Sequence, residues 1–299
     1  MGIEPKGRGY DMLYKNDREG RIAVFNDTAS RCRSNGRLKA AIKESIASQQ
    51  LILEDAEISG LASEHVYEQD ADVVISKKRS FEAAQAYIGQ KVCVLNFASA
   101  TNPGGGVTKG SSAQEECLCR CSTLYSCLNE SADKVGFHYR HKNMLANGEM
   151  DARYNDDCIY TPRVVVFKSD TALPQILPED EWYSVDIITC AAPNLRAKPN
   201  NLMNPEPGSK AVRLNDSELM ALHAKRTGRI LNIAKANGAE IVILGAFGCG
   251  AFQNPPAVVA KGMMEAVQSH RRDFKTIEFA VYCSPRDTAN YDAFKRMCY

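Results

Sequence analysis

Short apolar runs alternate with amphipathic segments along most of this 299-residue chain. The runs are rich in β-branched residues and predict strands at 73–75, 91–97, 163–168, 185–190, 240–245 and 277–282. Helical periodicity and capping signals predict helices at 17–47 with a break near 34–36, at 81–88, 113–128 and 215–237, from Pro255-Pro256 onward, and at 287–297. This alternation predicts an α/β fold, in which a central mixed, largely parallel sheet carries helices on both faces.

Two segments between these elements have little periodicity. Residues 129–157 are polar, and 194–215 contain several Pro and Asn residues. Long loops in globular domains often serve function, but the pattern does not show what these two cover. No internal repeat is present, so we expect a flexible N-terminus over 1–16 and one domain over 17–299, of which 17–70 forms a helical extension.

Composition narrows the class of protein further. Hydrophobic residues make up 44% and charged residues 24% of the chain, as in a globular domain with a buried core. The 37 basic and 36 acidic residues nearly cancel, which argues against general nucleic-acid binding, although backbone N–H groups can still hold a diphosphate. No run approaches the ~18 apolar residues of a membrane span, and the polar start lacks a secretory signal. We expect a cytoplasmic protein without membrane contact, and a monomer.

Two Gly-rich loops carry the strongest chemical signals. The first, 98–112, contains three successive glycines from Gly104, and the second, 246–254, places Gly248 and Gly250 on either side of a cysteine. Each loop follows an apolar strand and precedes a helix, so both belong at the sheet edge where ligands of such folds bind. Because glycine lacks a side chain, N–H groups in these loops can approach a ligand closely and hold a diphosphate.

Three polar residues, Gln114, Glu115 and Glu116, open the helix after the first loop. A carboxylate in the first turn is favoured by the helix dipole. Ser112 and Glu115 also match a capping box, which gives Glu115 a structural explanation. Glu116 has no such explanation. Since neighbouring helix positions point roughly 100° apart, only one of the two glutamates is expected to face a reacting bond.

The second loop also contains two aromatic residues, Phe247 and Phe252. We expect one of them to pack under the loop and the other to stack on the ligand. Cys249 is not expected to be a nucleophile, because no histidine stands at a recognisable partner spacing.

The other cysteine, histidine and aspartate residues indicate structural roles, and we expect neither a metal nor a cofactor. Three cysteines in apolar runs are expected in the core: Cys93, Cys190 and Cys283. Three alternating cysteines lack the spacing of a zinc site: Cys117, Cys119 and Cys121. Solvated loops are expected to contain His138, His141, Asp151, Asp156 and Asp157.

Three glycines, seven residues and then Gln-Glu-Glu resemble the signature of the poly(ADP-ribose) glycohydrolase (PARG) family. The flanking residues resemble the microbial branch, whose fold is a macrodomain with three α/β/α layers, from about residue 18 to the C-terminus. The resemblance implies that Glu116 is the catalytic acid/base, with Glu115 and Gln114 beside the reacting ribose, and that Phe252 orders the ribose and Glu116. The implied ligand contacts are Asn102, Gly104, Gly105, Gly106 and Val107 in the first loop, Phe247, Gly248, Cys249, Gly250 and Ala251 in the second, and Pro193 beside the adenine.

The reaction implied by this resemblance is hydrolysis of ribose–ribose O-glycosidic bonds in poly(ADP-ribose), from chain ends. Adjacent glutamates cannot straddle a sugar, so one carboxyl would act first as acid and then as base, which requires a pKa of Glu116 above its usual ~4.3. The implied partners are ADP-ribose, poly(ADP-ribose) and ADP-ribosylated proteins. Two alternatives stay open: a hydrolase that removes single ADP-ribose units from protein, a small molecule or DNA, and a non-catalytic ADP-ribose reader. The paired glutamates argue against a reader, and the seven-residue spacing argues for polymer.

Overall fold

A computed structural model of the protein describes residues 16–62, 64–132, 136–200, 210–284 and 286–298. Within these residues seven strands form one sheet. Their spatial order is β1 (Gln50–Ile52), β4 (Cys158–Val166), β5 (Tyr183–Cys190), β3 (Val92–Phe97), β6 (Ile241–Leu244), β7 (Thr276–Ala280) and β2 (Asp72–Ser76). The five strands from β5 to β2 run parallel, whereas β4 and β1 add on antiparallel. The predicted mixed, largely parallel sheet is therefore confirmed.

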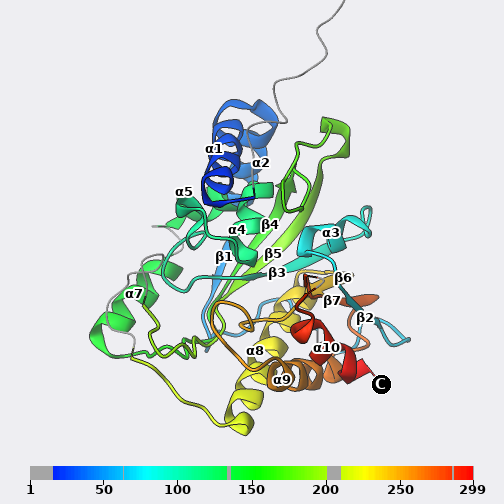
Figure 1. The fold of residues 1–299 in the computed structure, drawn as a ribbon. Coiled ribbons are helices and arrows are strands. Elements are labelled where there is room, and N and C mark those ends of the chain that lie inside the picture. Colours follow the sequence, from blue (N-terminus) through cyan, green and yellow to red (C-terminus); the bar gives the residue numbers. More distant parts are fainter. Residues whose placement is uncertain (1–15, 63, 133–135, 201–209, 285, 299) are drawn as a thin grey trace, which may run out of the picture.

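Helices cover both faces of this sheet (Figure 1). One face carries α8 (Asp216–Ala236), α9 (Pro256–Ser269) and α10 (Ala289–Lys295). The other carries α3 (Ser80–Gln85), α4 (Gln114–Cys121), α5 (Leu124–Glu130), α1 (Arg18–Ser34) and α2 (Gly36–Ala47). No helix in the described part of the chain is long and apolar enough to cross a membrane.

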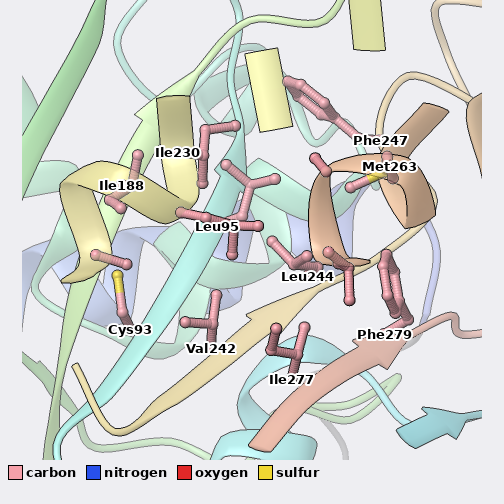
Figure 2. Packing of buried hydrophobic residues seen from close by; sticks show 14 of the residues in the cluster. Cys93, Leu95, Ile188, Ile230, Val242, Leu244, Phe247, Met263, Ile277 and Phe279 are labelled. Carbon is pink, nitrogen blue, oxygen red and sulfur yellow. The ribbon is translucent and has the colours of Figure 1, made fainter. Parts of the chain in front are cut away.

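The strand β3 shows how the sequence produces this layering. Successive side chains of a strand point to opposite faces of its sheet. Cys93 and Leu95 accordingly pack with Ile230 of α8 and Met263 of α9 (Figure 2), whereas Val94 joins the cluster on the opposite face. A strand buried on both faces must be apolar at nearly every position, which is the pattern that predicted it.

Three sequence predictions need correction at the level of the fold. The predicted helix over 113–128 is two helices, because the chain is extended at Ser122, where it forms a β-bridge with Val166. The extension over 17–70 is helical only as far as Ala47 and then contributes β1 to the sheet. The segment 129–157 contains the helix α7 (Phe137–Asn147), which polar residues concealed. The proposed flexible N-terminus falls almost wholly on residues 1–15, and the 194–215 loop partly on 201–209, outside the described residues.

Candidate active site

The two Gly-rich loops lie side by side because they follow neighbouring parallel strands, β3 and β6. They line one cavity of about 840 Å³, which is in the size range of sites for small organic ligands. The first loop and the start of α4 contribute Gly105, Gly106, Gln114, Glu115 and Glu116 to the wall. The second loop contributes Gly248, Gly250, Ala251 and Phe252.

Glu116 is held at the cavity wall by the first loop. The N–H of Gly106 donates to Oε1 of Glu116 at 2.8 Å, and the side chain is 7% exposed. The other carboxyl oxygen, Oε2, has no hydrogen-bond partner in the described part of the chain. Gly105 has a φ of +58°, and a Cβ there would lie 2.6 Å from Oε1 of Glu116. Only glycine therefore leaves room for this carboxyl at this distance.

Glu115 points to the end of β3 instead, and donors surround it. Its Oε2 accepts from the Ser99 N–H at 2.7 Å, its Oε1 accepts from Asn96 Nδ2 at 3.3 Å, and the Gly104 N–H adds a further hydrogen bond. The predicted capping box is wrong, because the N-cap is Ala113, which has no side-chain cap, and Glu115 is engaged elsewhere. A carboxylate that accepts from Asn96 of β3 and from two residues of the first loop does not turn back to its own helix.

Gln114 fixes the start of α4 against the sheet. Its Oε1 accepts from the Phe97 N–H at 2.9 Å, and its Nε2 donates to the Leu95 carbonyl at 2.8 Å and to Ser80 Oγ at 3.0 Å. Since every polar atom of this amide is engaged with the protein, its effect on the two glutamates is to position them.

Burial raises the pKa of both carboxyl groups. It raises the pKa of Glu115 to about 8, with the charge of Glu116 as the second cause, and it raises the pKa of Glu116 in the direction expected for a catalytic acid. Arg120 opposes the effect on Glu116 by charge attraction. Two buried carboxyls that are this close are costly to ionise together, so the pair retains a proton near neutral pH.

The second loop has free backbone donors. The N–H groups of Gly248, Gly250, Ala251 and Phe252 make no hydrogen bond to any described residue. Cys249 differs, because its N–H donates to the Ala246 carbonyl. The conformation depends on Gly248, whose φ is +81°. Successive free N–H groups on a cavity wall can bind an anion.

One of the two aromatic residues of this loop lies in the core, as expected, and the other lines the cavity. Phe252 lines the cavity and packs from behind against Tyr154, with 6.1 Å between ring centroids. Phe247 is fully buried against Phe97, so it is a core residue. Burial raises the pKa of the Cys249 thiol to about 12, which keeps it protonated.

Six residues expected at the ligand do not line the cavity. Gly104 lies under the ring of Tyr125, and Val107 is fully buried. Pro193 directs its carbonyl oxygen at Asn254, whereas its neighbour Ala192 does reach the cavity wall. The six residues are Asn102, Gly104, Val107, Pro193, Phe247 and Cys249.

Several basic residues of the cavity wall were not predicted from the sequence. Arg18 and Arg21 of α1 donate through Nε to the carbonyl groups of Lys109 and Gly110, which joins the N-terminal helix to the first loop. Arg79 and Arg196 also line the wall. No local signal marks the contacts of α1, because their partners lie 91 and 89 residues away along the chain.

One aromatic residue of the rim was also missed. Tyr282 lines the cavity with a ring that is 53% exposed, and the guanidinium of Arg79 lies 4.0 Å from the ring centroid. A large exposed aromatic side chain on a cavity wall offers a stacking surface.

The histidine and aspartate residues of 129–157 are mostly buried, which corrects the prediction of solvated loops. His141 is fully buried in α7 and lies 3.3 Å from Asp157, and Asp156 pairs with Arg226 at 2.7 Å. His138 is buried as well, and Asp151 alone is substantially exposed. No group of three or more metal-binding side chains occurs within the described residues.

The cysteines follow the predictions with one exception. Cys93, Cys190, Cys119 and Cys121 are buried, whereas Cys283 is partly exposed. Cys117 is also partly exposed, on the cavity wall.

The three-layer fold, with two Gly-rich loops at the carboxyl ends of adjacent strands, defines a macrodomain-like α/β protein. A sequence model of the microbial-type PARG catalytic domain matches residues 19–169. The chain therefore belongs to the microbial-type PARG family.

Solved structures agree with this assignment. PARG from Thermomonospora curvata is 27% identical with a TM-score of 0.74, over 93% of this chain and 99% of that one. The same enzyme bound to the inhibitor ADP-HPD is 28% identical with a TM-score of 0.74, over 94% and 100% of the two chains. PARG from Deinococcus radiodurans in complex with ADP-ribose is 28% identical with a TM-score of 0.67, over 85% and 95%. No curated protein sequence matches the chain.

Proposed function

We propose that this protein hydrolyses the ribose–ribose O-glycosidic bonds of poly(ADP-ribose), releasing ADP-ribose from chain ends, with Glu116 as the acid/base. Family membership supports the reaction class, and a similar structure from Deinococcus radiodurans contains ADP-ribose. The observation that carries the assignment of Glu116 is its unpartnered Oε2, on the wall of the cavity that both Gly-rich loops line.

The cavity offers a complementary group for each part of ADP-ribose. The free N–H groups from Gly248 to Phe252 suit a diphosphate, since they supply donors without a full positive charge. The reacting ribose then lies over Gly105 and Gly106, next to Glu116. For the adenine, the exposed ring of Tyr282 provides a stacking surface, with Ala192 on another part of the wall.

We place the proton that the carboxyl pair retains on Glu116 when the substrate reacts. Ser99, Asn96 and Gly104 donate to Glu115, and these hydrogen bonds favour its ionised form, in opposition to burial. Oε2 of Glu116 has no donor facing it, so it can hold a proton. Ionised Glu115 also places a negative charge beside the sugar carbon that becomes positive during the reaction.

The reaction then needs one carboxyl in two roles. The proton on Oε2 of Glu116 passes to the departing 2′-oxygen as the glycosidic C–O bond breaks, which leaves an oxocarbenium-like ribose. A water molecule adds to the anomeric carbon and gives a proton to the Glu116 carboxylate, which restores the acid. The products are ADP-ribose and a polymer shortened by one unit.

The substrate class is tested by a paired assay. Wild type is incubated with poly-ADP-ribosylated and mono-ADP-ribosylated protein, and the products are separated by size. The account predicts free ADP-ribose from the polymer and none from the mono-modified protein. Release from mono-modified protein alone would support the single-unit hydrolase, and tight ADP-ribose binding without turnover would support the reader.

A matched pair of variants connects the activity to the site. Glu116→Gln keeps the shape of the side chain but removes the proton, and it should abolish polymer shortening. The control is Glu265→Gln, an exposed glutamate of α9 outside this cavity. It should retain wild-type activity, and equal losses in both variants would refute the assignment of Glu116.

The proposal extends to partners and assembly. We expect the physiological substrates to be proteins that carry poly(ADP-ribose), and the protein to act as a monomer without general nucleic-acid binding. Light scattering during chromatography tests the first of these two physical properties, and a filter-binding assay with unmodified DNA and RNA tests the second.

A further inference from the structure

The asparagine that ends the second Gly-rich loop, Asn254, makes an unusual set of contacts with that loop. Nδ2 of Asn254 approaches three carbonyl oxygens, those of Pro193 at 2.7 Å, Gly248 at 3.1 Å and Phe252 at 3.3 Å. The Asn254 N–H donates to the same Gly248 carbonyl at 3.1 Å. The residue is 1% exposed, so water does not replace these contacts. One amide therefore joins both ends of the loop to the segment after β5.

These contacts fix which groups of the loop stay free. Since the carbonyl groups of Gly248 and Phe252 point at Asn254, the loop is held in the conformation whose N–H groups have no protein partner. The two held peptides also contain the N–H groups of Cys249 and Gln253, which donate within the loop, and the free N–H groups of Gly250, Ala251 and Phe252 lie between them. Gly248 is part of the same arrangement, because a Cβ there would lie 2.8 Å from Nδ2 of Asn254.

A buried histidine sets the direction of this amide. Nε2 of His223 lies 3.0 Å from Oδ1 of Asn254, and Nδ1 of His223 has no partner among the described residues. Burial lowers the pKa of His223 to about 4, so the ring is neutral, and the tautomer with the proton on Nε2 makes the only available hydrogen bond. A flipped amide would place an oxygen against three carbonyls.

The packing of α8 against α9 allows this contact. Gly262 of α9 has no side chain where α8 approaches: a Cβ there would lie 2.4 Å from the Met220 carbonyl oxygen and 3.1 Å from Cβ of His223. The ring of Phe247 meets His223 edge-on, with 5.9 Å between centroids. These contacts surround the ring of His223, and Nε2 points to Asn254 of the loop.

We propose that Asn254, oriented by His223, is a positioning residue that holds the second loop in its diphosphate-binding conformation. This inference rests on the proposed function for the identity of the ligand. It also separates the work of the two loops, because Glu116 is held by Gly106 and does not depend on Asn254. Loss of the Asn254 contacts should therefore weaken ligand binding and leave the rate of the chemical step on bound substrate nearly unchanged.

The chain contains a matched control for this pair. His270 and Asn232 also join α9 to α8 by an Nε2–Oδ1 contact, at 2.9 Å, and neither residue lines the cavity. The same substitutions at this second pair remove the same kind of hydrogen bond and leave the loop untouched.

The test measures ADP-ribose binding by calorimetry, polymer hydrolysis, and the melting temperature for each variant. Asn254→Ala should raise Kd for ADP-ribose and KM for polymer about tenfold or more, with kcat within about threefold of wild type. His223→Ala should do the same to a smaller degree. Asn232→Ala and His270→Ala should leave Kd within about twofold.

Rescue distinguishes positioning from a general loss of stability. His223→Gln carries an amide donor that can reach Oδ1 of Asn254, and it should restore most of the affinity lost in His223→Ala. If Asn254→Ala does not fold, the comparison of His223→Ala with His223→Gln tests the inference on its own. Folded variants whose Kd and KM stay within twofold of wild type would overturn the inference, as would losses of affinity equal to those at Asn232. Failure of the proposed function would look different, because wild type itself would then neither bind ADP-ribose nor shorten polymer.

Discussion

The two Gly-rich loops look alike in sequence, yet they use their backbone N–H groups in opposite ways. In the first loop, the N–H groups of Gly104, Gly105 and Gly106 all donate within the protein, two of them to the glutamates of α4. In the second loop, four N–H groups from Gly248 to Phe252 have no partner among the described residues. The first loop thus holds the glutamates in place, and the second loop leaves its N–H groups available to bind the ligand. Similar composition after similar strands does not imply a similar task.

Among changes outside Glu116 itself, the largest effect should come from adding one methyl group to the first loop. Gly105→Ala places a Cβ 2.6 Å from Oε1 of Glu116 at a φ of +58°. Left-handed backbone costs an alanine roughly 1–2 kcal/mol, and the carboxyl must also move. We expect kcat/KM for polymer to fall by about 100-fold or more.

Gly250→Ala is the matched change in the second loop. A Cβ at Gly250 would meet no atom within 4 Å, and its φ is not in the left-handed region. This variant should fold like wild type and lose mainly affinity for ADP-ribose. If Gly250→Ala lost as much kcat as Gly105→Ala, the division of labour between the loops would be wrong.

The next effect concerns the charge of Glu115. The charge of Glu116 raises the pKa of Glu115, so the two carboxyls retain a proton between them that a single carboxyl would hold less strongly. We expect wild-type kcat to decline at alkaline pH as the pair loses this proton, and Glu115→Gln to lower kcat about tenfold and move this decline to lower pH. A pH–rate profile of both proteins measures it. An unmoved alkaline limb would show that the two carboxyls do not interact.

The buried carboxyl pair should also make the free energy of unfolding depend on pH, which is a smaller effect. Burial and the charge of Glu116 raise the pKa of Glu115 from 4.5 to about 8, and since the two carboxyls retain one proton between them, the folded state binds more protons than the unfolded state between these values. The free energy of unfolding should therefore fall as pH rises from 5 to 8, on the order of 2 kcal/mol more in wild type than in Glu115→Gln. Urea unfolding at both pH values measures the difference, and parallel curves would contradict it.

The smallest effect is expected in the second loop itself. The Cys249 thiol is protonated because burial raises its pKa to about 12, and its side chain does not line the cavity. Cys249→Ala should therefore keep kcat and KM within about twofold of wild type. A loss of more than tenfold in kcat/KM in a folded variant would show that Cys249 takes part in binding or catalysis, which its position in the structure does not indicate.

Elements with a continuous apolar or Gly-rich pattern could be predicted from the sequence, and short or partly polar elements could not. Strands such as β3 were found because burial on both faces demands continuous apolar residues. The loops were found because glycines between a strand and a helix let backbone N–H groups approach a ligand. The short edge strand β1 was missed, since three residues carry no detectable period. In α7 the buried face includes His138 and His141, which a polarity pattern counts as solvated.

The site was predictable where a local motif fixed it and not where distant partners did. Glu116 follows from its place after the glycines, but the engagement of Glu115 with Ser99 and Asn96 depends on how α4 packs against β3. The ion pair between Asp156 and Arg226 joins residues 70 positions apart, so the sequence around either residue gives no signal that predicts it. Long-range pairs of this kind need the fold before they can be inferred.

The role of Glu116 in catalysis is tested most directly by measuring kcat and Kd together. The protein and Glu116→Gln are compared for kcat on poly(ADP-ribose) and for Kd of ADP-ribose under the same conditions. We predict that kcat falls about 1,000-fold, while Kd stays within about threefold because the second loop still holds the diphosphate. A variant that keeps kcat within tenfold of wild type would contradict the account.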